Sequence, residues 1–293
     1  RKEKQESFMN FVKHVWPQFI EGKHHKIYAE KLQDVADGKC KRLIINMPPR
    51  HTKSEFASYL FPTWLMGRRP DLKIIQATHT AELAVGFGRK IKNLIESEDF
   101  KDVFPDVSLA TDAKASGRWS TNGGGEYYAV GVGGALAGRG ADLAIIDDPV
   151  SEQDALSATA LDSIYEWYTS GPRQRLQPGG AIIIVMTRWS IRDLTAKVLS
   201  KQSGKGSDQW EVTCRTLLLK RVRLSSVSGG TLGRRILHPL AVILFSRMTL
   251  RLVKVTGLTI ARSQPGAFSI TMILVRIILY CLTRRGGAGS FLN

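Results

Sequence analysis

The chain has 293 residues, of which 43% are hydrophobic and 23% are charged, and its formal net charge is +16. This length corresponds to one large domain or two ordinary ones, and the apolar content is sufficient for a buried core. A disordered tail protein is therefore excluded. A disulfide-stapled scaffold is excluded as well, because the three cysteines have neither a paired number nor metal-ligand spacing, which fits a reducing compartment.

The positive charge is distributed unevenly along the chain. Residues 1–211 carry all 26 acidic residues, whereas residues 212–293 carry 13 Lys and Arg, no Asp or Glu and none of the six Trp. We therefore expect a folded domain at 1–212. The basic, acid-free segment at 213–293 is expected to result from a shift of reading frame and not to form a native fold. Its apolar run at 268–282 is shorter than the roughly 20 residues that cross a bilayer, so we expect no membrane association.

The first part alternates between helical patterns and short apolar strands. In chain order we expect helices at 6–20 and 26–37, a strand at 42–46, a helix at 55–66 and a strand at 72–78. A helix to residue 95 capped by Thr80, a strand at 143–147, a helix from 151 to 167 opened by a capping box of Ser151 and Asp154, and a strand at 181–186 follow. This alternation predicts an α/β fold whose mainly parallel sheet is flanked by helices on both faces.

The turn after the first strand has the sequence MPPRHTKS at residues 47–54. Lys53 and Ser54 match the end of the phosphate-loop pattern GxxxxGK[ST], whereas Met47 and Thr52 stand where the pattern has glycine. The loop follows a buried strand and opens a helix, where free N–H groups and the helix dipole favour a phosphate. Lys53 would contact the β and γ phosphates and Ser54 would hold magnesium. An ordinary strand-to-helix turn with a surface lysine is the alternative.

The strand expected at 143–147 ends in two adjacent carboxylates, Asp147 and Asp148. This is the form of a Walker B motif, in which the first acid binds magnesium and the second activates water. A capped turn is the alternative for this strand alone, but the upstream Lys-Ser loop favours the Walker B interpretation. Thr187 and Arg188 follow the last expected strand. Because ligands of parallel sheets bind at the carboxyl ends of strands, we expect both near the same nucleotide, with a surface arginine as the alternative.

A glycine-rich segment at 131–140 lies too close to the next strand to open the helix that a dinucleotide-binding fingerprint requires. We expect a flexible loop that presents Arg139 to a phosphate or to a neighbouring subunit. A glycine hairpin whose arginine meets only solvent is the alternative.

The histidines and the other basic residues give weaker indications. No zinc site is expected from the six scattered histidines, and His79 is interpreted as a turn residue. Arg173, Arg175 and Lys197 are assigned to solvated helix faces, with contacts to DNA phosphates as the alternative.

Three motifs together resemble the ATPase half of the large terminase subunit of tailed bacteriophages, in particular the contractile-tailed ones. They are PPRHTKSE at 48–55, GRGADLAIIDDP at 138–149, and VMTRW at 185–189 with Asp193 and Leu194. The resemblance covers roughly residues 5–212, with the motifs in the family's order. In that family the Walker A loop often has a Pro-Pro-Arg form, which accounts for the missing glycines.

The resemblance implies a P-loop ATPase motor that drives double-stranded DNA into the procapsid. It implies ATP and magnesium as cofactors, with Asp147 on magnesium, Asp148 as the catalytic carboxylate and Thr187 in the motif that couples hydrolysis to DNA movement. It further implies a homo-oligomeric ring, the portal protein and the small terminase subunit as partners, and a location in the host cytoplasm at the procapsid portal. The ATP-binding loop would comprise Pro49, Arg50, His51, Thr52, Lys53 and Ser54.

The nuclease domain of that family uses a cluster of acidic residues, and no carboxylate side chain follows Glu211, so we expect no nuclease activity. Two other functions are weighed. Another P-loop DNA translocase or helicase-like ATPase would be expected to carry further motifs and a second motor domain, and neither is visible. A non-enzymatic, basic nucleic-acid-binding protein is disfavoured because most of the excess charge lies in the acid-free segment.

Overall fold

The computed structural model describes residues 1–111, 115–201, 208–213, 216–217 and 242–243. The chain divides into two units, Arg1–Arg247 and Met248–Asn293. The second unit lies wholly outside the described residues. Most of the acid-free segment at 213–293, whose origin and fold were predicted from composition, lies outside them too.

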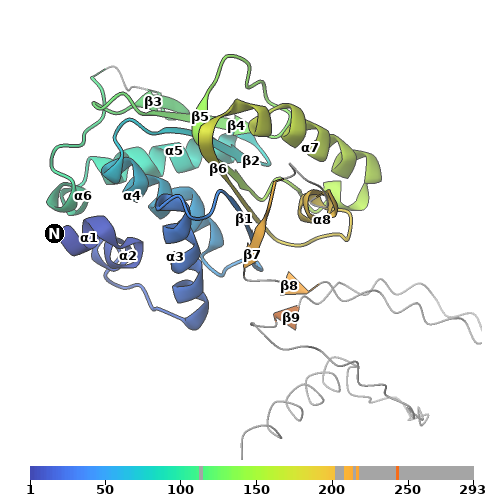
Figure 1. Ribbon diagram of the computed structural model, residues 1–293, viewed down its shortest axis with the longest axis horizontal. Coiled ribbons are helices and arrows are strands. Elements are labelled where there is room, and N and C mark those ends of the chain that lie inside the picture. Colours follow the sequence, from blue (N-terminus) through green and yellow to red (C-terminus); the bar gives the residue numbers. More distant parts are fainter. Residues whose placement is uncertain (112–114, 202–207, 214–215, 218–241, 244–293) are drawn as a thin grey trace, which may run out of the picture. The chain divides into compact units, whose positions relative to one another are not determined.

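Seven strands form one sheet in the order β3-β4-β2-β5-β6-β1-β7 (Figure 1). They are β1 (Arg42–Asn46), β2 (Lys73–Thr78), β3 (Arg118–Ser120), β4 (Glu126–Gly131), β5 (Ala141–Asp147), β6 (Leu176–Met186) and β7 (Glu211–Thr213). Neighbouring strands are parallel except the edge strand β3, which is antiparallel to β4. The predicted mainly parallel α/β fold is confirmed. Two further short strands, β8 (Thr216–Leu217) and β9 (Val242–Ile243), pair with each other antiparallel.

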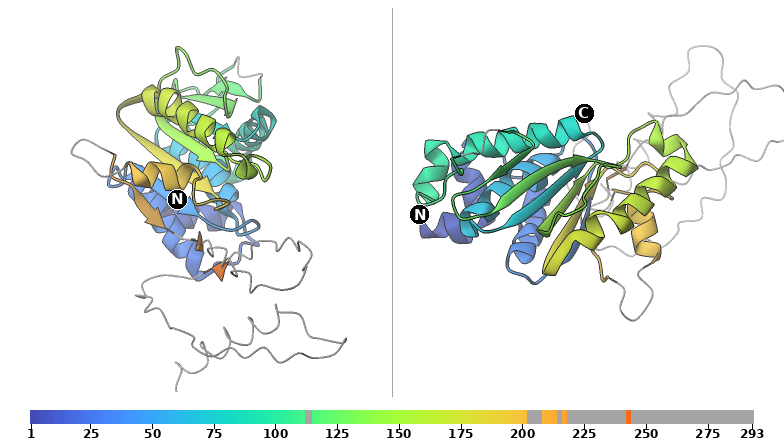
Figure 2. Two further views of the ribbon diagram at one scale, coloured as in Figure 1. Left: turned by 90° about the vertical axis from the view of Figure 1, so that its right-hand side faces the viewer. Right: turned by 90° about the horizontal axis from the view of Figure 1, so that it is seen from above.

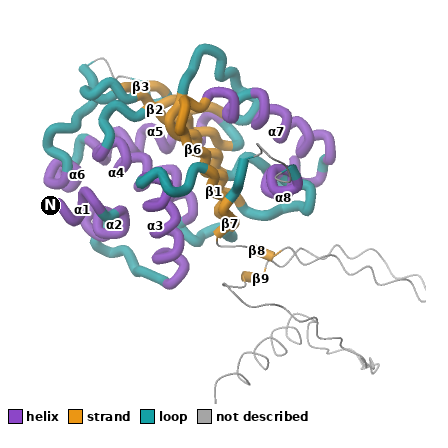
Figure 3. Tube along the Cα trace, viewed as in Figure 1, coloured by secondary structure: helices purple, strands orange, loops and turns teal. Residues whose placement is uncertain are grey.

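Helices cover both faces of the sheet, and Figures 2 and 3 show the strands between two helical groups. The described helices are α1 (Lys2–Glu6), α2 (Phe8–Val15), α3 (Lys23–Ala36), a π-helix (Glu55–Leu60) that continues into α4 (Phe61–Arg68), α5 (Ala81–Ile95), α6 (Glu98–Val103), α7 (Ala158–Ser170) and α8 (Leu194–Ser200), with 3₁₀ turns at Asp154–Leu156 and Pro172–Arg175. No helix among them is long and apolar enough to cross a membrane.

Alternate strand residues feed two separate hydrophobic cores. Leu43 and Ile45 of β1 point to the core shared with α2 through α6, whereas Ile44 points to the core shared with α7 and α8. This period of two is the property of a strand buried on both faces. Packing on both faces therefore fixes the sheet, and the sheet positions the loops at its carboxyl edge.

Several helix boundaries differ from the sequence-based prediction, and two of these differences have a clear physical reason. The helix expected at 6–20 is divided at Ser7, which caps α2 by accepting a hydrogen bond from the Asn10 N–H, and it ends at Val15 because Pro17 disfavours helical backbone in the residue before it. Ser151 and Asp154 do form reciprocal hydrogen bonds of 3.0 and 3.2 Å. They open only a 3₁₀ turn, however, so the prediction that they cap the long helix is wrong.

The segment at 208–213 closes the edge of the sheet beside β1. Its Asp208 carboxylate forms ion pairs with Arg42 at 3.0 Å and with Arg173 at 2.8 Å, so Arg173 is not simply a solvated residue. Trp210 is buried against the core of α7 and α8. β7 extends to Thr213, one residue beyond the domain end expected at 212.

Gly88 is predicted to be necessary for the packing of α5 on β4. A Cβ at this position would lie 2.3 Å from the Ser116 carbonyl oxygen and 2.7 Å from the Tyr127 ring, whereas a Cβ at Gly86 on the same helix meets nothing within 4 Å. Gly88→Ala should therefore lower the free energy of unfolding by about 1–3 kcal/mol through overpacking. Gly86→Ala is the matched control and should raise it by up to about 1 kcal/mol through helix propensity. Urea unfolding of the full chain measures both, and equal effects would contradict the packing argument.

Candidate functional site

Polar residues from three loops meet at the carboxyl edge of the sheet. The loop after β1 carries Lys53 and Ser54, the end of β5 carries Asp147 and Asp148, and Thr187 follows β6. Because β1, β6 and β5 are parallel neighbours, their carboxyl ends lie at one edge. The structure thus brings together five of the residues that the sequence indicated, in the same part of the molecule.

The loop from residue 47 to residue 54 turns tightly into the following helix. Pro49 and Arg50 are exposed, and the His51 Nδ1–H donates to the Pro49 carbonyl oxygen at 2.9 Å. Arg50 and Thr52 have positive φ angles of 62° and 59°. Thr52 therefore adopts, at the position of the missing second glycine, a left-handed backbone of the kind that glycine adopts without strain.

Asp147 is held by hydroxyl groups on the helix that follows the loop. The Ser54 hydroxyl donates to Oδ1 at 3.0 Å, and the Ser58 hydroxyl donates to Oδ2 at 2.7 Å. Ser58 in turn accepts from the Gln76 side-chain N–H of β2 at 3.1 Å. Both Ser58 and Gln76 are fully buried, and Gln76 Oε1 finds no hydrogen-bond partner among the described residues. The carboxylate is therefore fixed from two directions.

Burial dominates the electrostatics of Asp147, whose exposed fraction is 2%. Loss of solvent and the adjacent Asp148 raise the pKa of Asp147 to about 6, although Ser58, Lys53 and Ser54 lower it in part. The charged form of this carboxyl group is thus costly in the folded protein, as expected where a site needs a buried charge.

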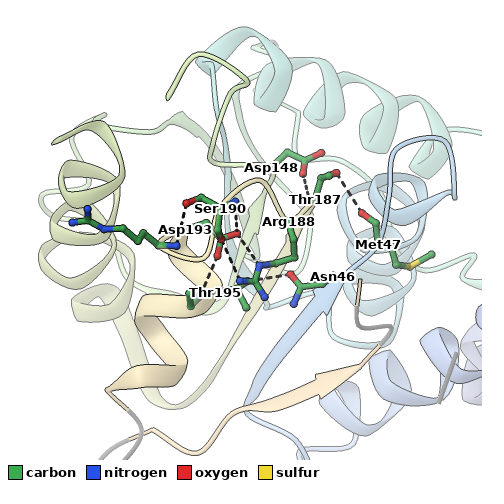
Figure 4. Close-up of polar contacts among 10 residues, drawn as sticks. Asn46, Met47, Asp148, Thr187, Arg188, Ser190, Asp193 and Thr195 are labelled. Atoms are coloured by element: carbon green, nitrogen blue, oxygen red, sulfur yellow. Dashed lines mark hydrogen bonds and ion pairs between the residues drawn. The ribbon is translucent and has the colours of Figure 1, made fainter. Parts of the chain in front are cut away.

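Asp148 links the loop after β1 to the end of β6. Its Oδ2 pairs with Nζ of Lys53, a residue that is 7% exposed, and its Oδ1 accepts from the Thr187 backbone N–H at 2.8 Å. The Thr187 hydroxyl donates to the Met47 carbonyl oxygen at 3.3 Å, as Figure 4 shows. Asp148 itself has a φ of 43°, a conformation in which Asp is enriched. The backbone of Asp148 after β5 and the Thr187 N–H after β6 therefore direct the Asp148 carboxylate toward Lys53.

Arg188 does not point to the predicted nucleotide position. Its Nε–H donates to the Asp193 carboxylate at 2.7 Å, and Asp193 is fully buried (Figure 4). The other Asp193 oxygen caps α8 by accepting from the Ala196 N–H at 3.1 Å. Arg188 is therefore neither a surface arginine nor a residue of the cluster, and instead fixes the loop between β6 and α8.

Arg139 lies apart from the cluster within this chain. It precedes Ala141, the first residue of β5, whereas Asp147 is the last, and a strand of this length spans about 20 Å. The Arg139 guanidinium lies over the Tyr128 ring of β4, 4.7 Å from the ring centroid. Of the two predicted targets of Arg139, this placement disfavours a phosphate bound to the same chain.

The oxygen atoms around Asp147 are of the kind that binds a magnesium ion. A hydroxyl and a carboxylate within 3.0 Å of each other offer the hard oxygen ligands that Mg²⁺ prefers. Within the described residues, no group of three or more His, Cys, Asp and Glu side chains is gathered for a metal ion.

Three residues of this region escaped the sequence analysis. Ser58 stands four residues after Ser54 on the same helix, a spacing that could have signalled a shared face. Gln76 is a lone polar residue in the middle of a buried strand, which is a signal in itself. His25, from α3, contacts Thr52 and is one of the six histidines from which no zinc site is expected.

Comparisons with known proteins give a structural likeness but no match at the level of sequence. Neither the scan against protein-family models nor the search of curated proteins finds a match. Among solved structures, the chain is similar to the crystal structure of the HK97 bacteriophage large terminase, with a TM-score of 0.47 and 14% sequence identity over 70% of this chain and 42% of that one. The chain thus covers less than half of that protein's length. The α/β fold assignment depends on this chain's own strand order.

The raised pKa of Asp147 predicts a pH-dependent penalty to stability. An unfolded aspartate loses its proton near pH 4, whereas folded Asp147 loses it near pH 6, so the folded state becomes relatively less stable as the pH rises between these values. Asp147→Asn should therefore raise the unfolding temperature at about pH 8 and change it little at about pH 4.

The matched control is Asp71→Asn, because the Asp71 side chain is 72% exposed. It should show no such pH dependence. Thermal unfolding of the three proteins at both pH values measures the difference. A destabilised Asp147→Asn protein at high pH would contradict the assignment.

Proposed function

We propose that this chain is an ATP-hydrolysing motor domain of the large-terminase type that drives double-stranded DNA into a procapsid. The observation that carries the ATPase part is the direct contact between the two candidate motifs, in which Lys53 meets Asp148 and Ser54 meets Asp147. An ordinary turn with a surface lysine does not bury that lysine to 7% exposure beside a carboxylate. The DNA-packaging part is supported by the resemblance of the three motifs to that family.

Lys53 and Asp148 are proposed to act on opposite sides of the transferred phosphate. An incoming phosphate competes with Asp148 for the Lys53 ammonium group, so nucleotide binding frees the carboxylate. Asp148 stays oriented by the Thr187 N–H and can then accept a proton from the attacking water. The Thr187 hydroxyl also donates to the Met47 carbonyl oxygen. Thr187 is therefore proposed to link Asp148 to the loop after β1.

Ser54 and Asp147 are the residues that would hold magnesium. A bound ion there would neutralise charge on the phosphates. The Ser58 hydroxyl donates to Oδ2 of Asp147. This bond keeps the side chain in one orientation, including when Oδ1 exchanges Ser54 for another partner. Arg50, His51 and Thr52 are proposed to supply backbone N–H groups to the phosphates, and Pro49 to stiffen the turn.

The remaining assignments are also proposals. A homo-oligomeric ring, the portal protein, the small terminase subunit and a place at the procapsid in the host cytoplasm follow from the motif resemblance. A helicase-like ATPase, the alternative, would unwind a duplex, whereas a packaging motor would move along an intact one.

The central prediction is that Lys53→Ala and Asp148→Asn both strongly reduce ATP turnover. Loss of the Lys53 cation removes a phosphate contact, so Lys53→Ala should also lose nucleotide binding. Asp148→Asn should lower turnover by about 10²–10⁴-fold, the usual contribution of a general base, while nucleotide still binds.

Steady-state phosphate release and equilibrium binding of a fluorescent ADP separate the two variants. Lys26→Ala changes a lysine that is 69% exposed and serves as the control for charge loss. Undiminished hydrolysis by either site variant, once purified, would exclude the proposed site. Measurement of DNA binding against salt on the same samples tests the non-enzymatic alternative.

A second prediction concerns Arg139 as a residue supplied to the neighbouring subunit. Arg139→Ala should then lose activity in the assembled ring, because charge on the transferred phosphoryl group is left without its cation. Mixing Arg139→Ala with Lys53→Ala protein should restore part of the activity, since some interfaces combine an intact loop with an intact arginine. Complete absence of rescue at every mixing ratio would instead support a structural role over Tyr128.

A further inference from the structure

The phosphate loop holds a β-branched residue in a backbone conformation that such residues rarely adopt. Thr52 has a φ of 59°, in the left-handed region, at the position where the phosphate-loop pattern has its second glycine. A glycine reaches this conformation without a steric cost, whereas threonine needs support from its surroundings.

His25 of α3 contacts the Thr52 side chain directly. The His25 Nε2 atom lies 2.7 Å from Thr52 Oγ1, and the Thr52 hydroxyl lies 2.6 Å from the His51 carbonyl oxygen. Because that carbonyl can only accept, the Thr52 hydroxyl donates to it and accepts from the His25 Nε2–H. The side chain of Thr52 is thus fixed by one donor and one acceptor.

The tautomer of His25 is fixed by a second hydrogen bond. The Gly22 backbone N–H donates to His25 Nδ1 at 2.9 Å, so the proton of the neutral ring is on Nε2, facing Thr52. Burial and the neighbouring His24 lower the pKa of His25 to about 4, which keeps the ring neutral near pH 7. The ring stacks on Phe56 at a centroid distance of 5.3 Å. These contacts therefore fix the orientation of the His25 ring.

The same helix also holds the next residue of the loop. One turn after His25, the Tyr28 hydroxyl donates to the Lys53 carbonyl oxygen at 2.7 Å. Two consecutive loop residues are thus attached to α3, a helix that precedes β1 in the chain. The support comes from outside the strand–loop–helix unit to which phosphate-loop patterns refer.

We propose that His25 is a positioning residue of the nucleotide site, whose Nε2–H bond to Thr52 holds the left-handed turn that a glycine would adopt unaided. With the turn held, Lys53 and Ser54 face the phosphates. The inference deepens the proposed function and rests on it for the identity of the ligand, whereas the attachment of the loop to α3 can be measured without a nucleotide.

Substitutions at both ends of this hydrogen bond test the inference in the full chain. In His25→Gln the side-chain amide N–H lies near the position of Nε2. The shorter side chain of His25→Asn extends only to the position of Nδ1, so it keeps the contact with Gly22 and loses the one with Thr52. Thr52→Val loses the hydroxyl and keeps the branched Cβ, and Thr52→Gly loses the hydroxyl and frees the backbone. His14→Asn on α2 is the matched control for the chemical change.

Two readouts are measured for each protein. The first is the dissociation constant for a fluorescent ADP with Mg²⁺, and the second is amide hydrogen exchange across residues 49–54 without nucleotide. His25→Asn and Thr52→Val should each weaken binding about tenfold, the worth of one hydrogen bond, and speed exchange in the loop. His25→Gln should retain most of the affinity. Adding Thr52→Gly to His25→Asn should restore binding, and Thr52→Gly should bind better than Thr52→Val.

The outcomes separate this inference from the proposed function. Normal exchange and affinity in His25→Asn, or an equal loss with and without Thr52→Gly, would overturn the role of His25 while the nucleotide site stands. If no protein binds nucleotide but the exchange pattern is as expected, the proposed function fails and the support of the loop by His25 stands. Thr52→Val and Thr52→Gly give the answer even if His25 variants do not fold.

Discussion

The site is organised around one buried carboxylate. Asp147 is 2% exposed, and an ionised carboxyl group without solvent is stable only where hydrogen bonds replace water. Those bonds come from Ser54 and Ser58, so the helix after the loop at 47–54 must lie against the end of β5. The position of Lys53 beside Asp148 follows from the same contact. The carboxylate thus ties the loop after β1 to a strand from which it is separated by β6.

The polar network continues away from the cluster through the end of β6. Thr187 contacts both Asp148 and the loop residue Met47, and the next residue, Arg188, is locked to Asp193 at the start of α8. Thr195 of α8 in turn donates to Asn46 at the end of β1, at 3.1 Å. Asp148 is therefore attached to a short, braced segment and not to a free loop.

Sequence patterns predicted the elements whose periodicity is simple. β1 and α5 have the expected bounds, because a run of branched residues and a Thr80 cap leave little ambiguity. β6 begins at Leu176, five residues earlier than expected, because Pro178 and Gly179 suggest a turn. In the structure Pro178 and Gly179 lie within β6. The register of the β5–β6 pairing shifts at this point. The gathering of Lys53 with the two carboxylates was predictable, since the carboxyl ends of parallel strands converge.

What the sequence could not supply were contacts that depend on tertiary placement. Gln76 reaches Asp147 only through Ser58, a residue of another element, and no local pattern joins them. The left-handed conformation of Thr52 was hidden because a motif records residue types and not φ angles. The missing glycine weakened the match to the phosphate-loop pattern, although the backbone at that position has the conformation of a glycine.

The edge strand β7 pairs with β1 and contains Glu211, the last acidic residue of the chain. β1, which leads into the loop at 47–54, would be an open edge without β7, and exposed edges favour intermolecular pairing. Asp208 also neutralises Arg42 at the start of β1 together with Arg173. A part-buried arginine that loses its carboxylate is destabilising. The residues from 208 to 213 therefore belong structurally to the domain that holds the site, and any shorter form of the chain that keeps the loop in place must include them.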